Sequence, residues 1–157
     1  MNITDQRRLA AEASRGISSG PSYDLAGLLL EKHAPAGQIL EFGAGTGNFA
    51  RKLQKEGFAE KITCADILPA PQNPLSDFEW IQADLNNPLP TGDESFDGIV
   101  STEVIEHLEN PRAVFREFFR LLRPGGWLVL TTPNQESFRS LASLAMGHHF
   151  AAFLGAS

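Results

Sequence analysis

Residues 41–49 (EFGAGTGNF) constrain the fold most, because they place glycines at positions 43, 45 and 47 directly after an apolar segment. Residues 38–42 predict a short buried strand, and residues 48–56 predict a helix that Gly57 can end in the left-handed conformation. A loop between a strand and a helix must turn sharply, and glycines without Cβ atoms let its backbone approach a ligand closely. The stretch therefore predicts a strand–loop–helix unit whose loop binds a ligand.

Further helices and strands alternate along the rest of the chain. Helices are predicted at 5–14, 22–33 and 110–122, and strands at 61–66, 78–83, 96–101 and 126–132. The last helix has Asn110 as a candidate N-cap and Pro111 at its first position, and Pro124-Gly125-Gly126 stops it. Such alternation predicts a parallel sheet covered by helices on both faces, with ligands at the carboxyl ends of the strands. The expected fold class is α/β, a doubly wound Rossmann-like sheet.

The chain divides into three parts around this sheet. We expect an N-terminal helical segment at 1–37, a ligand-binding core at 38–134 and a C-terminal helical tail at 135–157. One connection differs from a regular crossover, since residues 68–74 carry three prolines where a helix would normally lie. An irregular, extended linker is therefore expected between the second and third strands.

Composition narrows the class of partner. A chain of 157 residues with 42% hydrophobic content suits one packed domain, and its net charge of -6 argues against nucleic acid as a partner. The N-terminus MNITDQRR lacks the apolar core of a signal peptide, and no apolar run approaches the ~20 residues that span a bilayer. We therefore expect a cytoplasmic protein without a membrane partner. Cys64 is the single cysteine, and its neighbours suggest a buried strand thiol.

The charges around the glycine loop bear on which ligand it binds. Dinucleotide-binding loops place the third glycine three residues after the second, whereas here the spacing is two throughout and position 48 is Asn48. Glu41 would repel a pyrophosphate but attract a sulfonium or an amino group. Asp66 ends the second strand, where it can accept hydrogen bonds from a ribose diol, and Asp84 follows the third strand with Leu85 beside it. The pattern favours a cationic nucleoside ligand.

Five segments in order along the chain carry a resemblance to a known family. They are EFGAGTGNF, the strand end at Asp66, ADLN (83–86), FDGIVSTEVIEHLENP (96–111) and LLRPGGWLVLTTPN (121–134). Together they resemble class I S-adenosylmethionine-dependent methyltransferases over residues 38 to 134, and most of all the small-molecule branch that includes quinone-biosynthesis methyltransferases. One glycine motif alone is weak, but five in order are specific.

The resemblance implies S-adenosylmethionine as the cofactor and assigns residues to its parts. Its methionine part would be lined by Glu41, Gly43, Ala44 and Gly45. The ribose and the adenine edge would meet Asp66 and Ile67, and the adenine would meet Asp84 and Leu85. Thr102 and Glu103 would close the pocket after the fourth strand. A small-molecule or biosynthetic-intermediate acceptor of the methyl group is expected, and its identity stays open.

His107 has two possible roles. Glu103, Glu106 and His107 could lie on one side of a helical turn, which would suit a metal, but a further set of ligands is visible only at His148-His149. We therefore expect no metal site and a turn with His107 at the border of the pocket. His107 is also the candidate general base toward a substrate hydroxyl, because imidazole titrates near neutrality.

The resemblance also raises a question about the C-terminus, because the family's fold carries two further strands after the fifth. Residues 138–153 read as a mildly amphipathic helix instead. A truncated chain is the favoured interpretation, and a partner chain at the unpaired sheet edge, and hence oligomerisation, is the other. Two alternatives to an active methyltransferase remain at this point: an NAD(P)-dependent oxidoreductase, and a cofactor-binding fragment without activity of its own.

Overall fold

The computed structural model describes residues 2–14, 20–33, 36–72 and 78–134. The elements follow one another as α1 (Ile3–Ser14), α2 (Gly20–His33), β1 (Gln38–Phe42), α3 (Asn48–Lys55), β2 (Lys61–Asp66), β3 (Glu79–Gln82), β4 (Phe96–Thr102), the 3₁₀ turn η1 (Ile105–His107), α4 (Pro111–Leu121) and β5 (Leu122–Thr131). Within these residues no helix combines the length and the apolar character needed to cross a membrane. The expected tail at 135–157, with its helix and His148-His149, lies outside the described residues.

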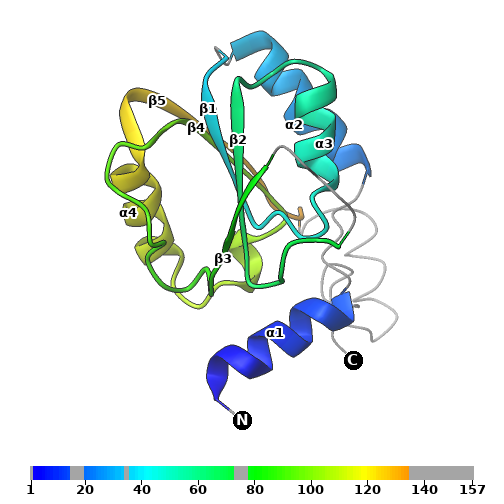
Figure 1. Ribbon diagram of the computed structural model, residues 1–157, viewed down its shortest axis with the longest axis vertical. Helices are drawn as coiled ribbons and strands as arrows, with labels where there is room; N and C mark the ends of the chain where they lie inside the picture. The colour runs from blue at the N-terminus through cyan, green and yellow to red at the C-terminus, as the bar shows by residue number, and fades with distance from the viewer. Residues whose placement is uncertain (1, 15–19, 34–35, 73–77, 135–157) are drawn as a thin grey trace.

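The five strands form one sheet in the order β3-β2-β1-β4-β5, and every neighbouring pair is parallel. Helices α2 and α3 cover one face of this sheet and α4 covers the other (Figure 1). This confirms the predicted doubly wound α/β fold. Because parallel strands all end at the same edge, the loops after β1, β2, β3 and β4 meet there.

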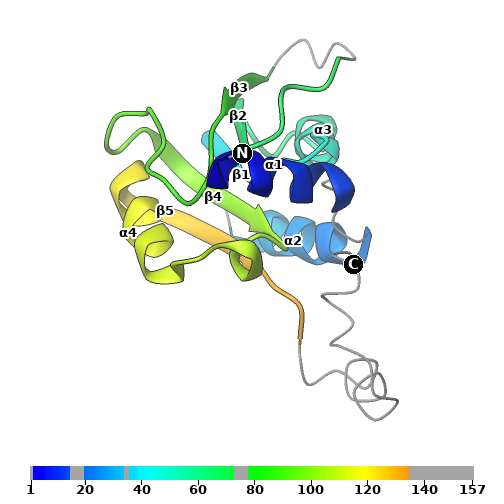
Figure 2. The same ribbon diagram turned by 90° about the horizontal axis from the view of Figure 1, so that it is seen from below.

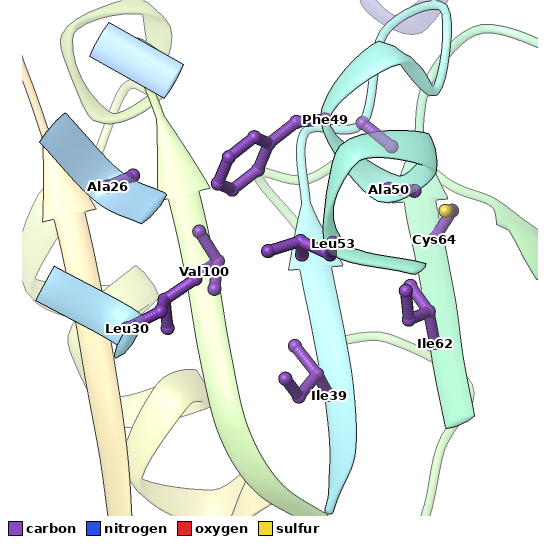
Figure 3. Close-up of a cluster of buried hydrophobic side chains, with 10 residues drawn as sticks. Ala26, Leu30, Ile39, Phe49, Ala50, Leu53, Ile62, Cys64 and Val100 are labelled. Atoms are coloured by element: carbon purple, nitrogen blue, oxygen red, sulfur yellow. The ribbon is translucent and has the colours of Figure 1, made fainter. Parts of the chain in front are cut away.

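Two apolar clusters hold the layers together, one on each face of the sheet. The first joins α2 and α3 to β1, β2 and β4, and its members are almost fully buried: Leu30, Phe49, Leu53, Ile39, Ile62 and Val100 (Figure 3). The buried thiol of Cys64 belongs to this cluster, as expected. The second cluster packs α4 on the opposite face. In it the rings of Phe42 and Phe118 meet edge to face, with their centroids 4.9 Å apart.

The helix ends follow the local sequence. Asn110 accepts a hydrogen bond from the N–H of Ala113, and Pro111 opens α4, as predicted. Gly57 adopts a left-handed φ of 73° after α3, so the N–H groups of Gly57 and Phe58 reach back to the carbonyls of Gln54 and Leu53. The described residues 67–72 of the proline-rich linker form neither helix nor strand, in agreement with the expectation.

The bounds of β5 differ from the expected 126–132. The strand begins at Leu122, where it pairs with Phe96, and resumes regular pairing at Trp127 opposite Gly98. The turn at Pro124-Gly125-Gly126, with Gly125 at a φ of 81°, is therefore a bulge inside the strand. The prediction that this turn stops the helix is wrong: α4 ends at Leu121, and Leu122 already has extended backbone and pairs with β4 before the turn.

The three aromatic residues of α4 differ in burial. Phe118 is 1% exposed, whereas Phe115 is 48% and Phe119 is 85% exposed. Val114, Phe118 and Leu121 form the face that packs on the sheet. Phe115 and Phe119 lie outside that face, because a helix buries only one stripe.

Helix α1 lies apart from the two helical layers. Figure 1 shows it beyond the lower edge of the sheet, and the view from below in Figure 2 shows it crossing in front of the strand ends. Side-chain contacts to the loops after β3 and β4 hold it there. Helix α1 thus lies over the edge of the sheet where the ligand is predicted, whereas α2 of the same N-terminal segment packs on the sheet face.

Candidate cofactor site

The glycine loop turns through three left-handed residues, Gly43 (φ 86°), Gly45 (φ 54°) and Gly47 (φ 72°). The N–H groups of Gly43 and Ala44 both donate to the carbonyl of Ala65 in β2, at 2.8 and 3.1 Å. A Cβ at position 43 would lie 2.2 Å from Cγ2 of Val104. Gly43 is thus required by its φ and by the packing of Val104, as well as by any close approach of a ligand.

Glu41 lies under this loop instead of facing out of it. Its side chain is buried, with 2% of the residue exposed, and it contacts the N–H of Ala50 in α3 and the thiol of Cys64, 3.7 Å away. Burial raises the pKa of Glu41 to about 8, against the lowering effect of the Ala50 N–H. Burial thus favours the protonated, neutral carboxyl, whereas the charge of Arg51 opposes this and a bound cation would oppose it further.

Asp66 ends β2 and joins two loops. Its Oδ2 accepts from the N–H of Gly45 at 2.7 Å, and its Oδ1 accepts from the N–H of Leu68 at 2.8 Å. Burial raises the pKa of this carboxyl, while the surrounding backbone N–H groups oppose the rise. The backbone N–H of Ile67 is a third donor to this carboxylate, so about one of its four lone-pair positions is left for a hydroxyl donor. Ile67 follows at the predicted place, and its carbonyl accepts from the side chain of Gln82 at 3.2 Å.

Asp84 follows β3 at the expected edge, but α1 already occupies its carboxylate. Its Oδ2 accepts from Thr4 Oγ1 at 3.2 Å and pairs with Nη1 of Arg7 at 2.5 Å. Its Oδ1 accepts from the backbone and the side chain of Asn86. Although burial acts to raise the pKa of Asp84, these donors outweigh it and hold the pKa below the usual range. Leu85 beside it is 8% exposed and packs in the second apolar cluster.

Thr102 and Glu103 lie at the end of β4. Thr102 is buried at 3% exposure, opposite Thr131 in β5. Glu103 adopts a left-handed φ of 57°, which is uncommon for a residue with a side chain. Its N–H donates to the carbonyl of Thr131, and its Oε1 accepts from Thr131 Oγ1, both at 3.0 Å. This strained residue directly follows the last residue of β4, at the predicted pocket.

His107 closes the 3₁₀ turn that follows, and its side chain is 59% exposed. Glu106 beside it is 9% exposed, and burial raises its pKa, while a hydrogen bond of 3.3 Å from Thr132 opposes the rise. Within the described ranges, no three histidine, cysteine or acidic side chains are grouped closely enough to hold a metal ion. The turn predicted here is present, with His107 at its solvent side.

The residues present fit S-adenosylmethionine at two of its three parts. Thr46 in the glycine loop has a buried hydroxyl oxygen with no hydrogen-bond partner among the described residues, so a polar ligand group would satisfy it. Asp66 has acceptor capacity left for a ribose diol. The adenine end differs, because Thr4 and Arg7 already contact Asp84.

Sequence reasoning did not find Thr4, Arg7 or Val104. Arg7 belongs to a short run of charged residues in DQRR that looks like an ordinary solvated helix face. Val104 is one apolar residue among several after β4. No local pattern marks contacts between residues 77 or 80 positions apart, as those of Asp84 with Arg7 and Thr4 are.

The parallel five-stranded sheet, the left-handed glycine loop and the acidic residues at successive strand ends define a nucleoside-binding α/β domain of the class I methyltransferase type. Residues 11–154 match the family model described as a methyltransferase domain, and the chain belongs to this family. The predicted family is confirmed, which decides against the NAD(P)-dependent interpretation of the glycine loop.

Curated relatives agree with this assignment. The chain is 31% identical over 146 residues to a malonyl-[acyl-carrier protein] O-methyltransferase of Paenibacillus sp., covering 87% of this chain and 50% of that protein. It is 27% identical over 120 residues to the mitochondrial ubiquinone biosynthesis O-methyltransferase of Candida albicans, covering 71% of this chain and 37% of that protein. The chain thus spans half or less of the length of these relatives.

Solved structures show the same fold. The N-methyltransferase NodS of Bradyrhizobium japonicum, in complex with S-adenosyl-L-homocysteine, superposes with a TM-score of 0.59 and 25% identity, over 82% of this chain and 66% of that one. A putative methyltransferase of Bacillus halodurans gives a TM-score of 0.60 at 23% identity, over 80% and 62% of the two chains. Family and fold together confirm S-adenosylmethionine as the predicted cofactor.

Proposed function

We propose that this chain is the cofactor-binding part of an enzyme that transfers the methyl group of S-adenosylmethionine to a small-molecule or biosynthetic-intermediate acceptor. The observation that carries the proposal is the row of acidic residues at one edge of the sheet. Following the strand order β3-β2-β1-β4, these are Asp84, Asp66, Glu41 and Glu103. Such a row suits a ligand with hydroxyl and amino donors along its length and a positive charge at one end.

The roles of the chain's own residues follow from their places. Asp66 offers acceptors to a ribose diol while its bond to Gly45 keeps the loop in its left-handed shape. The loop offers bare backbone and the Thr46 hydroxyl to the methionine end. Glu41 supports this end from beneath, because its ionisation becomes favourable beside a cation. Ala44, Gly45, Ile67, Leu85 and Thr102 complete the proposed lining.

The bound cofactor supplies an activated methyl group on a sulfonium, so the protein's part is to align the acceptor with it and to exclude water. The acceptor side lies between the ends of β4 and β5, where Glu103 and Glu106 accept from Thr131 and Thr132. His107 stands at the solvent border of this region, and we propose it as the general base for a hydroxyl acceptor. A carboxylate acceptor would need no base.

The names of two relatives suggest acceptors to test: a malonyl group on an acyl carrier protein, and an intermediate of ubiquinone biosynthesis. Both are biosynthetic intermediates, which supports that class of acceptor for this chain. A cytoplasmic location stays a prediction. So does association through the outer side of β5, which pairs with no other strand among the described residues.

Calorimetric titration of the chain with S-adenosylhomocysteine tests the cofactor site, with NAD as the matched control ligand. We expect saturable binding of the first ligand and none of the second. Transfer of label from methyl-labelled S-adenosylmethionine to malonyl-carrier protein or to extract fractions then tests activity. Binding without any transfer would leave a cofactor-binding domain that is inactive alone, and absent binding would contradict the proposal altogether.

A further inference from the structure

The carboxylate of Asp84 has no acceptor position left for a ligand. A carboxylate offers about four lone-pair positions. Thr4 and Arg7 take those of Oδ2, and the backbone and side-chain N–H groups of Asn86 take those of Oδ1. Only 5% of the Asp84 side chain is exposed. An adenine amine can therefore reach this carboxylate only after one of its present partners has moved away.

Of these partners, Asn86 is two residues away in the same loop, whereas Thr4 and Arg7 come from α1. This difference decides which donors can leave Asp84. The bonds from Asn86 belong to a local turn within one loop, and they persist when that loop moves as a unit. The bonds from Thr4 and Arg7 join separate parts of the chain, so a movement of α1 breaks both together.

Arg7 is the strongest of the contacts that hold α1 in this place. Its Nη1 pairs with Asp84, and its Nη2 lies 2.6 Å from Oε1 of Glu109, in the segment between η1 and α4. The N–H of Glu109 in turn donates to Asn86 Oδ1 at 2.8 Å. Charge-assisted bonds of this kind are stronger than neutral ones, although Glu109 is 63% exposed and its half of the bridge is screened by water. We call the Arg7 contacts with Asp84 and Glu109 the Arg7 bridge.

We infer that α1 gates the adenine end of the cofactor site and that the Arg7 bridge holds the gate closed. The inference rests on the proposed function, because it assigns the ligand of Asp84 to the adenine amine of the cofactor. In the closed state the first turns of α1 occupy the position that the amine would take. Cofactor binding must then displace Thr4 and Arg7 from Asp84, and the free energy of that displacement lowers the observed affinity.

The bridge can be weakened without touching any residue of the proposed cofactor site. Arg7→Ala removes both of its pairs, and Glu109→Gln removes only the exposed one. Arg8→Ala is the matched control, since Arg8 pairs with Asp5 of the same helix at 3.5 Å and is not in the bridge. Arg7→Ala and Arg8→Ala each remove one positive charge, whereas Glu109→Gln removes one negative charge, so a general charge effect would act in opposite directions in the arginine and glutamate variants.

Stopped-flow tryptophan fluorescence with S-adenosylhomocysteine measures the effect. Trp80 is a suitable reporter, because its indole N–H donates to the carbonyl of Leu68, directly after Ile67. We expect S-adenosylhomocysteine to associate faster with Arg7→Ala and to bind it with a Kd lower by about fivefold or more. The reason is that the variant spends less time in the closed state, which does not bind the ligand. Glu109→Gln should move both values in the same direction by less, and Arg8→Ala should leave them unchanged.

Hydrogen exchange of the α1 amides in the wild-type chain gives a second readout. Added S-adenosylhomocysteine should speed their exchange, because α1 leaves Asp84. Equal or weaker affinity in both Arg7→Ala and Glu109→Gln, or slower exchange in α1, would overturn the gate while leaving the cofactor site intact. If the wild-type chain does not bind S-adenosylhomocysteine, the proposed function fails, and the gate fails with it.

Discussion

The carboxylate of Asp66 accepts a hydrogen bond of 2.7 Å from the backbone N–H of Gly45, so the end of β2 holds the middle glycine of the loop after β1. A second bond, from the N–H of Leu68, holds the start of the next connection. One buried acidic side chain thus fixes the positions of two loops that meet at the cofactor site. Replacing Asp66 should therefore affect cofactor binding in two ways: by removing its proposed contact with the cofactor and by loosening the two loops.

Replacement of this acid gives the first prediction. Asp66→Asn keeps the shape but removes the charge and half of the acceptor capacity, so we expect S-adenosylhomocysteine affinity to fall by about 1.5–3 kcal/mol, the usual contribution of hydrogen bonds to a charged group. Calorimetric titration measures it, and the melting temperature separates the structural part. Asp24→Asn, an exposed acid on α2, is the control. Equal affinity in the Asp66 variant would remove this residue from the site.

The buried carboxyl of Glu41 gives a prediction about pH. Because burial raises its pKa from 4.5 to about 8, the native state holds a proton that the unfolded state releases between these values. The contribution of Glu41 to the free energy of unfolding is therefore fully present below the pKa of the unfolded state. It is lost as the pH rises through the pKa of the folded state. Glu41→Gln removes the titration, so the variant should gain stability relative to the wild type as the pH rises.

Urea denaturation at several pH values between the two pKa values measures this difference for Glu41→Gln. The exposed Glu31→Gln on α2 is the control and should show no comparable trend. A constant difference between wild type and Glu41→Gln across the range would mean that Glu41 is already ionised in the native state. Asp66, whose pKa burial also raises, is present in both proteins, and its negative charge adds to the rise in the pKa of Glu41.

Gly43 and Gly57 allow strain and crowding to be separated. Both have left-handed φ values, 86° and 73°, but a Cβ at 43 would lie 2.2 Å from Val104, whereas a Cβ at 57 meets nothing within 4 Å. We expect Gly57→Ala to cost about 1–2 kcal/mol from the backbone alone. Gly43→Ala should cost about 1–3 kcal/mol more, because overpacking adds to the strain.

The free energies of unfolding of both variants, and of Gly43→Ala combined with Val104→Ala, check this. The double variant should recover part of the stability lost in Gly43→Ala, since alanine at position 104 makes room for the new methyl group at position 43. Equal costs at positions 43 and 57 would show that Val104 moves away freely.

The two neighbouring aromatic residues of α4 give a prediction about stability. Phe118→Ala should cost about 3–5 kcal/mol, the range for a large buried aromatic residue. Phe119→Ala, at 85% exposure, should stay within about 0.5 kcal/mol. Thermal and urea unfolding of the two variants measure both values. A large loss in Phe119→Ala would mean that its ring is covered in solution.

Much of this architecture could be predicted because its signals are local. Asn110, Pro111 and Gly57 mark helix ends by the hydrogen bonds and φ values that those residue types provide. The three glycines mark a turn that only residues without a Cβ make easily. The early start of β5 could not be predicted, because pairing of Leu122 with Phe96 depends on the neighbouring strand.

The sequence by itself determined the order of strands and helices, the edge of the sheet where the acidic residues gather, and the kind of ligand they suit. Hydrophobic periodicity and turn chemistry act over a few residues, and parallel strands bring all carboxyl ends together. Only the tertiary structure decided that Glu41 is buried beneath the loop and that Arg7 holds Asp84. Burial and ion pairing depend on which surfaces meet in space, and those meetings join residues that nothing in the local sequence connects.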